Sequence, residues 1–195
     1  MSASGRTAPI VRKPATADRR IERTRQALMT GFIDLLLKGG YEALTINAVI
    51  ERANVGRSTF YEHYTGKEDI LRESLARPFS ALAGTIGATA QPPSLLAMVA
   101  HFRENQRLAR TLFAPPTRPL LVRVLASHIE PRLPPGTKLQ LPAGLLALHL
   151  AEAQLGLLDH WLTSKFTCRA ETIAEAIFAT TQALVTAHHR RSTTL

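Results

Sequence analysis

The chain has 195 residues and a formal net charge of +9, from 24 basic and 15 acidic side chains. This length allows one small and one medium domain, and the basic charge favours a polyanionic partner. The single cysteine, Cys168, excludes an internal disulfide and a metal site built from several cysteines. No apolar run reaches the ~18 residues of a membrane span, and the N-terminus lacks the apolar segment of a signal peptide. We therefore expect a cytoplasmic protein that does not contact the membrane.

The first 25 residues hold seven basic side chains and only two acidic ones. Residues 1–17 are rich in Ser, Thr, Ala, Gly and Pro, which predicts a flexible basic arm. Such an arm is either a plain terminus or a segment that touches DNA phosphates or the minor groove.

A first helix is predicted from residue 18 to residue 38 and should end at Gly39-Gly40. Its apolar residues recur at helical spacing: Ile21, Leu28, Phe32, Leu35 and Leu36. Basic side chains near its start would lie close to DNA phosphates: Arg19, Arg20 and Arg23.

Two short helices with a tight turn between them are predicted next. Thr45 precedes an apolar run that ends at Ala53 and can cap the free N–H groups of that helix. Asn54 lies where the chain must reverse, and Asn tolerates a left-handed backbone. Gly56 can start the second helix, in which Phe60 is spaced to point inward. This is the layout of a helix-turn-helix, whose second helix enters the DNA major groove.

A further helix should open at the sequence Thr65-Gly-Lys-Glu68, which fits the S/T-x-x-E capping box. In this interpretation Thr65 is the cap and Glu68 reaches back to it. Lys67 would then lie beside free backbone N–H groups that attract phosphate. The alternative is that Lys67 is only a solvated charge.

The segment FYEHYTGKEDIL from Phe60 to Leu71, together with Thr45 and the turn at Asn54-Val55, resembles the TetR-type transcriptional regulators, the tetracycline-repressor family. The strong resemblance covers residues 20–75. Two residues depart from the family pattern, because Asn54 replaces the usual turn Gly and Gly56 the usual capping Ser. The resemblance implies a bacterial regulator with an all-α fold. A three-helix DNA-binding domain at 18–65 would precede a helical ligand-binding and dimerisation domain at 66–190.

The resemblance also implies how DNA would be read by a homodimer on a palindromic operator. Arg57 is the best candidate for base reading, because its guanidinium can pair with guanine O6 and N7. Ser58 and Thr59 can also reach bases, and by the family pattern Asn47 favours adenine. Side chains expected at or beside phosphates are Thr45, Tyr61, His63, Tyr64 and Lys67. For Tyr61 and Tyr64 core packing is the alternative. His63 is expected to be structural or adjacent to a phosphate, with a metal ligand or catalytic base as the alternative.

Prolines divide the remainder of the chain into helical blocks. The helix after residue 66 should continue into the eighties, with a kink or early stop near Arg77 because Pro78 lacks a backbone N–H. The later blocks are predicted at about 94–113, with a break near Glu104-Asn105, and at 118–130, 143–164 and 170–189. The last two blocks are apolar over most of their circumference. We expect them to form a four-helix bundle with the same helices of a second copy, rather than a monomeric core.

The family resemblance implies a mostly apolar cavity for a small-molecule effector between residues 94 and 162. Side chains that could line it are Met98, His101, Phe102, Phe113, His149 and Trp161, each with ordinary core packing as the alternative. Repression is the common mode in the family, and the resemblance therefore implies a repressor.

Two other classes of function are alternatives to a DNA-binding regulator. An enzyme would need a nucleophile or metal constellation, but the chain has no HExxH, GxSxG or P-loop sequence. The one weak metal candidate is the stripe of His149, Glu152 and His160. We therefore expect no catalytic residues, metal or cofactor. A helix-turn-helix that serves only a protein partner is disfavoured by the presence of Arg57, Tyr61 and Lys67.

Overall fold

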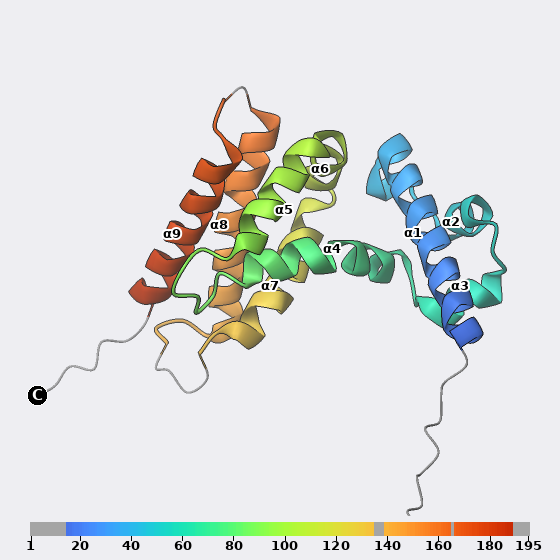
Figure 1. Ribbon diagram of the computed structural model, residues 1–195, viewed down its shortest axis with the longest axis horizontal. Helices are drawn as coiled ribbons and strands as arrows, with labels where there is room; N and C mark the ends of the chain where they lie inside the picture. Colours follow the sequence, from blue (N-terminus) through green and yellow to red (C-terminus); the bar gives the residue numbers. More distant parts are fainter. Residues whose placement is uncertain (1–14, 135–138, 165, 189–195) are drawn as a thin grey trace, which may run out of the picture.

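The computed structural model describes residues 15–134, 139–164 and 166–188, which form helices joined by short turns (Figure 1). In chain order the helices are α1 (Ala15–Ala43), α2 (Ile46–Ala53), α3 (Arg57–His63), α4 (Lys67–Ala83), α5 (Pro93–Glu104), α6 (Gln106–Phe113), α7 (Arg118–Ile129), a 3-10 turn η1 (Glu130–Arg132), α8 (Ala143–Thr163) and α9 (Ala170–Ala187). None of the described residues forms a strand, and the predicted all-α fold class is confirmed.

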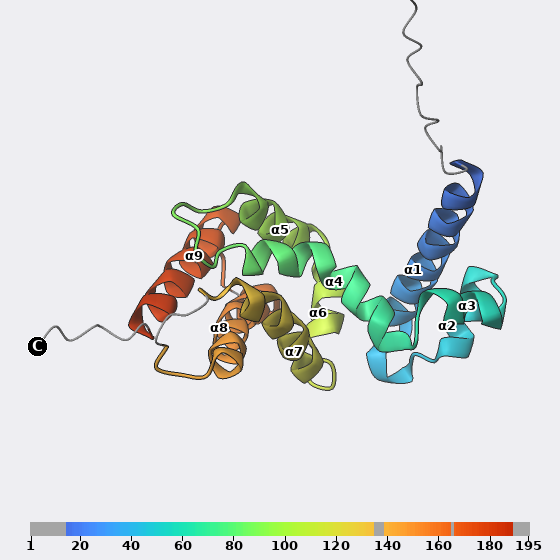
Figure 2. The same ribbon diagram turned by 90° about the horizontal axis from the view of Figure 1, so that it is seen from below.

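Two groups of helices lie at opposite ends of the molecule (Figures 1 and 2). Helices α1, α2 and α3 form a small head, and helices α5 to α9 form a larger body. Helix α4 runs from the head into the body, and α1 also packs against α6. The head is therefore held to the body at two places, by α4 and by the contact between α1 and α6.

Helix α1 buries the apolar face that its sequence predicts, because Leu28, Phe32 and Leu36 are buried. It leaves helical geometry at Gly40, whose φ of 76° lies in the left-handed region that glycine tolerates. Ile21 departs from the prediction, since 49% of its surface is exposed. The first turns of α1, to which Ile21 belongs, project beyond the rest of the head in Figure 2. An arm is predicted for residues 1–17. Residues 1–14 lie outside the described residues, and residues 15–17 belong to α1.

Helix α4 continues through Pro78 to Ala83, so the expected continuation into the eighties is confirmed, and of the two alternatives for Arg77, a kink or a stop, the stop is wrong. Proline removes one backbone hydrogen bond from a helix interior. Here the flanking side chains Leu75, Phe79 and Leu82 are buried, so packing against the body supports the helix on both sides of the missing bond.

The predicted helical blocks of the body are found with small shifts at their ends. The expected break near Glu104-Asn105 is confirmed, because Asn105 lies between α5 and α6 and its side-chain amide donates to the carbonyl of His101 at 3.0 Å.

A buried polar cluster holds the end of α4 to the last two helices. The Gln154 amide donates to Thr181 at 2.9 Å and to Thr85 at 3.1 Å, and Gln182 donates to the carbonyl of Thr85 at 2.7 Å.

The turn at Asn54 yields a first prediction. Its backbone is left-handed, with φ 52° and ψ 49°, a conformation that costs an ordinary L-residue about 1–2 kcal/mol. We expect Asn54→Ala to lower the free energy of unfolding in urea denaturation by about 1 kcal/mol. Asn54→Gly, the matched control, should leave it unchanged or raise it slightly. Equal stability of the Ala and Gly variants would contradict this account of the turn.

Candidate DNA-binding surface and ligand cavity

The helix-turn-helix of the head is built by local backbone chemistry. The Thr45 hydroxyl oxygen accepts a hydrogen bond from the N–H of Ala48 at 3.2 Å, and the predicted cap of α2 is confirmed. Asn54 ends α2 in the left-handed conformation that was expected, and Gly56 begins α3 without a side-chain cap. Phe60 is completely buried, as predicted, and fixes which face of α3 points outward.

An exposed cluster spans α2 and α3 and consists of Asn47, Arg57 and Tyr61. The Arg57 guanidinium donates to the side-chain oxygen of Asn47 at 3.3 Å. Its central carbon lies 5.8 Å from the centre of the Tyr61 ring, within the range of a cation–π contact. A guanidinium carries five N–H donors, so most remain available to a base edge or a phosphate. Thr45 and Ser58 are exposed too, whereas Thr59 is half-buried.

Tyr64 is only 4% exposed, and the structure places it in the core of the head rather than at the surface. Its ring centre lies 5.9 Å from that of Phe60. Burial, with a smaller contribution from the carboxylate of Glu73, raises the pKa of Tyr64 to about 12. Tyr64 follows α3 in extended backbone with its side chain buried, which agrees with the packing alternative. His63 is half-buried, with its ring 6.3 Å from that of Tyr64.

Lys67 opens α4 and points back toward the end of α1. Its ammonium donates to the carbonyls of Tyr41 and Leu44 at 3.0 and 3.1 Å and lies 4.5 Å from the centre of the Tyr41 ring. An ammonium has three N–H donors, so one remains for a phosphate. Lys67 therefore joins α1 to α4, a role that its sequence position did not indicate.

The capping box predicted at Thr65 and Glu68 is wrong by one residue. Gly66 is the residue that precedes α4, and the partner of Thr65 is Asp69, whose carboxylate accepts from the Thr65 N–H at 2.8 Å. The Thr65 hydroxyl donates to the same oxygen. These bonds lower the pKa of Asp69. Glu68 instead pairs with Arg72, one turn further along the helix.

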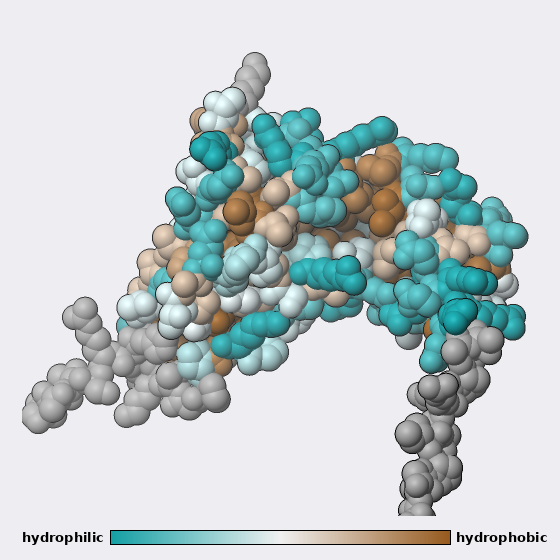
Figure 3. Space-filling view, viewed as in Figure 1, coloured by the Kyte–Doolittle hydropathy of each residue, from teal (hydrophilic) through white to brown (hydrophobic). Residues whose placement is uncertain are grey.

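The arginines of the head and of α4 divide into paired and unpaired groups. Ion pairs join Arg25 to Glu73, Arg52 to Asp34 and Arg72 to Glu68. Three others near the start of α1 are exposed and have no ion pair within the described part of the chain: Arg19, Arg20 and Arg23. Hydrophilic side chains cover most of the visible head surface in Figure 3. Unpaired guanidinium groups on such a surface suit a polyanion.

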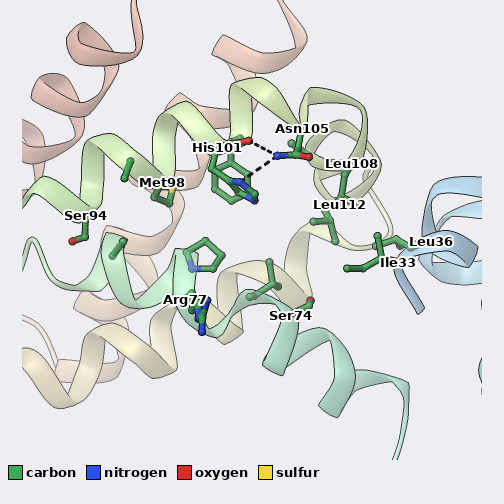
Figure 4. A pocket seen from close by; sticks show the side chains of 16 residues that line it. Ile33, Leu36, Ser74, Arg77, Ser94, Met98, His101, Asn105, Leu108 and Leu112 are labelled. Atoms are coloured by element: carbon green, nitrogen blue, oxygen red, sulfur yellow. Dashed lines mark hydrogen bonds between the residues drawn. The ribbon is translucent and has the colours of Figure 1, made fainter. Parts of the chain in front are cut away.

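A cavity of about 550 Å³ lies where the head meets the body, a size typical of small-molecule sites. Three of the predicted lining residues, Met98, His101 and Phe102, do line it (Figure 4). The other three lie elsewhere. Phe113 packs on Phe102 with ring centres 6.3 Å apart, and Trp161 is buried with its indole N–H donating to the Cys168 carbonyl.

His149, the last of the predicted lining residues, is exposed, with its ring 5.7 Å from that of His188. The metal alternative that joined His149 to Glu152 and His160 gains no support, because the Glu152 carboxylate is paired with Arg118 at 2.8 Å. In the described ranges no group of three or more metal-ligating side chains gathers, and no helix is long and apolar enough to cross a membrane.

Sequence reasoning missed the contribution of the head and of α4 to the cavity. Ile33 and Leu36 of α1 form one wall, and Arg77 of α4 lies on another. The apolar spacing of α1 signals a buried face, but it does not say that part of this face borders a cavity. Only the packing of α1 on α6 shows that.

Comparisons with known proteins place these features among bacterial regulators. Residues 33–74 match the profile of a family described as "Bacterial regulatory proteins, tetR family". The uncharacterized HTH-type transcriptional regulator YxbF of Bacillus subtilis is 35% identical over 81 residues, which are 41% of this chain and 21% of that protein. The HTH-type transcriptional repressor KstR of Rhodococcus jostii is 38% identical over 58 residues, 30% of this chain and 27% of the repressor. These matches span only a fifth to about a quarter of the relatives' own length.

Solved structures extend the likeness to the whole fold. A TetR transcriptional regulator from Streptococcus agalactiae superposes with a TM-score of 0.56 at 28% identity, covering 91% of this chain and 100% of that one. A TetR-family regulator from Streptomyces coelicolor gives a TM-score of 0.54 at 19% identity, with 91% and 99% covered, and shares the fold.

The buried tyrosines of the head predict a dependence of stability on pH. The pKa of Tyr64 is raised from 10.0 to about 12, and burial raises that of Tyr41 to about 12 as well. Because folding raises the pKa of each phenol, the folded state favours the neutral hydroxyl. This preference stabilises the fold fully below pH 10 and is lost as pH rises from about 10 to about 12. The free energy of unfolding should therefore fall in this window.

The measurement is urea denaturation at several pH values. Tyr64→Phe and Tyr41→Phe should each make the fall shallower, and the double variant shallower still. A slope that is the same in all four proteins would contradict the placement of these hydroxyls.

Proposed function

Since residues 33–74 match the tetR family profile and the fold is that of TetR regulators, we propose that this chain is a TetR-type transcriptional regulator, which binds a palindromic operator as a homodimer and leaves it when a small molecule occupies its body. TetR regulators bind DNA and act as dimers. The observation that carries the proposal is the exposed cluster of Asn47, Arg57 and Tyr61, which joins the two helices of the helix-turn-helix.

Arg57 is the side chain that we propose reads a base. It is the first residue of α3, and the start of the recognition helix is the part that reaches base edges. The hydrogen bond to Asn47 and the contact with Tyr61 hold the guanidinium in place before DNA arrives. A bidentate pair with guanine O6 and N7 would contribute roughly 1–3 kcal/mol of discrimination. Ser58 and Thr59 would add contacts on the same helix.

Phosphate contacts would set the position of the head on the duplex. The N-terminal end of α2 at Thr45 offers backbone N–H groups, and the exposed Tyr61 hydroxyl can donate. Lys67 retains one N–H, and Arg19 and Arg20 are exposed near the start of α1. These contacts carry no sequence information themselves, but they make binding depend strongly on salt.

Helices α8 and α9 would form the dimer interface. Helix α8 buries one face against α7 and α9 and exposes Leu145 and Leu148, which are 51% and 38% accessible. Helix α9 exposes small residues at Ala179, Ala183 and Ala187, which would allow close approach of a second helix pair. Large exposed leucines beside small residues on neighbouring helices suit burial against a second copy. The two heads would then enter successive major grooves about 34–36 Å apart or at a multiple of that spacing.

Release by a small molecule follows if the ligand prefers one arrangement of head and body. The cavity is bordered by both α1 and α4, so the position of the head is coupled to its shape. A ligand shifts such an equilibrium only by its difference in affinity for the two arrangements. Repression is the mode that we propose, because KstR, with which the matched segment shares 38% of its residues, is a repressor.

Selection of bound fragments from random DNA should yield a palindrome bound by one dimer. Arg57→Ala should weaken binding to that site by about 10- to 100-fold, which corresponds to the loss of one bidentate base contact. Arg107→Ala, the same change at an exposed position of α6, is the control and should leave affinity unchanged. Failure to enrich any sequence, or equal effects of the two variants, would refute the proposed base reading.

The dimer is tested by sedimentation at micromolar concentration. Leu148→Glu, alone or with Leu145→Glu, should convert the dimer to a monomer, because a carboxylate would be buried without a partner in the interface. Ile21→Glu places the same charge at an exposed apolar position of α1 and should leave the dimer intact. A wild-type protein that sediments as a monomer would exclude the α8–α9 interface.

A further inference from the structure

The cavity at the junction of head and body has walls from four helices. Helix α1 supplies Ile33 and Leu36, α4 supplies Ser74, Leu75, Arg77, Pro78 and Ala81, and the rest come from α5, α6 and Asn105 between them. In Figure 3 an apolar surface is visible where α5 and α6 approach α1. The volume of about 550 Å³ would hold a small organic molecule.

The two ends of the cavity differ in polarity. Figure 4 shows aliphatic side chains gathered at the end next to α1: Ile33, Leu36, Leu108 and Leu112. Arg77 and His101 lie away from that end, on α4 and α5. The side chain of Asn105 is engaged by His101, since its amide lies 3.2 Å from the ring Nδ1 and 3.0 Å from the carbonyl. A ligand that matches these walls has an apolar body and a polar group at one end.

The charges of the lining side chains indicate which polar group the ligand carries. None of the sixteen described side chains that line the cavity is acidic, and Arg77 carries the only fixed positive charge among them. Arg77 is exposed and has no ion pair with any described residue, whereas Arg72 on the same helix is paired with Glu68. A guanidinium fork matches the geometry of a carboxylate and forms hydrogen bonds that are stronger than neutral ones.

We propose that the cavity binds an amphipathic organic carboxylate, with its apolar body against α1 and α6 and its carboxylate at Arg77. This inference rests on the proposed ligand-responsive function and names the chemical class of the effector. The ligand lies between head and body and touches Ile33 on one side and α4 on the other. Its affinity therefore depends on how the head is placed, and occupancy changes the balance between head positions.

The probes are decanoate, decanol and decyltrimethylammonium, which share an apolar chain and differ in charge. Binding is measured by calorimetry on the full chain without DNA. Decanoate should bind at least about tenfold more tightly than decanol, the difference expected for one charge-assisted hydrogen bond, and the cation should bind most weakly. Arg77→Gln should weaken decanoate by about tenfold and leave decanol unchanged. Arg107→Gln, which removes an arginine outside the cavity, should alter neither.

Two further variants locate the ligand. Ala97→Trp adds a large side chain at an exposed position of the cavity wall and should abolish decanoate binding. Ile33→Ala, at a half-buried position of α1, should weaken decanoate by about threefold and hexanoate less, because only the longer chain reaches α1. Equal binding of decanoate and decanol, preference for the cation, or insensitivity to both Arg77→Gln and Ala97→Trp would overturn the inference.

Operator binding is measured separately on the protein without ligand. If decanoate binds as described but operator is never bound, the proposed function fails and the carboxylate site stands. If operator is bound and carboxylates are not, the site fails and the DNA-binding function stands.

Discussion

Helix α1 buries Leu28, Phe32 and Leu36, and the neighbours that cover this face come from both parts of the molecule. Helix α2 packs on it within the head, while α4 and α6 reach it from the body. Burying three such side chains contributes about 1.5–3 kcal/mol each, and the packing of α6 and α4 on α1 helps to hold the head in one position. The head is consequently not an independent unit on a loose linker, and its orientation is set by what α1 contacts.

A second connection reinforces the first. The Lys67 ammonium at the start of α4 binds two carbonyls just after the glycine break of α1 and stacks on the Tyr41 ring. The far end of α4 is held by the side-chain amides of the buried Gln154 and the half-buried Gln182. Helix α4 is thus fixed at one end to the head and at the other to the helices proposed to form the dimer. A displacement of α4 would be transmitted to the head, which gives a ligand beside Arg77 a physical route to the DNA-binding surface.

Much of the fold was predictable because it depends on local chemistry. The Thr45 cap, the left-handed Asn54, the inward Phe60 and the proline-bounded helices of the body all follow from side chains and their immediate backbone. Two wrong predictions both concern α4, one its course through the body and the other the local choice of partner at its start. The continuation of α4 through Pro78 depends on packing against the body, and the preference of Thr65 for Asp69 over Glu68 depends on how the chain enters α4.

Some residues of the candidate site were likewise predictable from the sequence, and others were not. Exposure of Asn47, Arg57 and Tyr61 was predictable from the helix-turn-helix pattern, but the inward turn of Tyr64 was not. Half of the expected cavity residues line the observed cavity. Phe113 and Trp161 belong to the packed core and His149 is exposed, because residue type alone cannot distinguish a cavity wall from the core or the surface. Arg77 was not among the predicted cavity residues, because its importance depends on the absence of acidic side chains around the cavity. That absence is a property of the folded chain.

The account is tested most directly by a crystal structure of the chain on its selected operator. It predicts α3 in the major groove, the Arg57 guanidinium on a base edge beside Asn47, and Tyr64 still packed on Phe60 inside the head. A complex in which α3 lies outside the groove, or in which Tyr64 has turned out to a phosphate while Arg57 contacts no base, would contradict it.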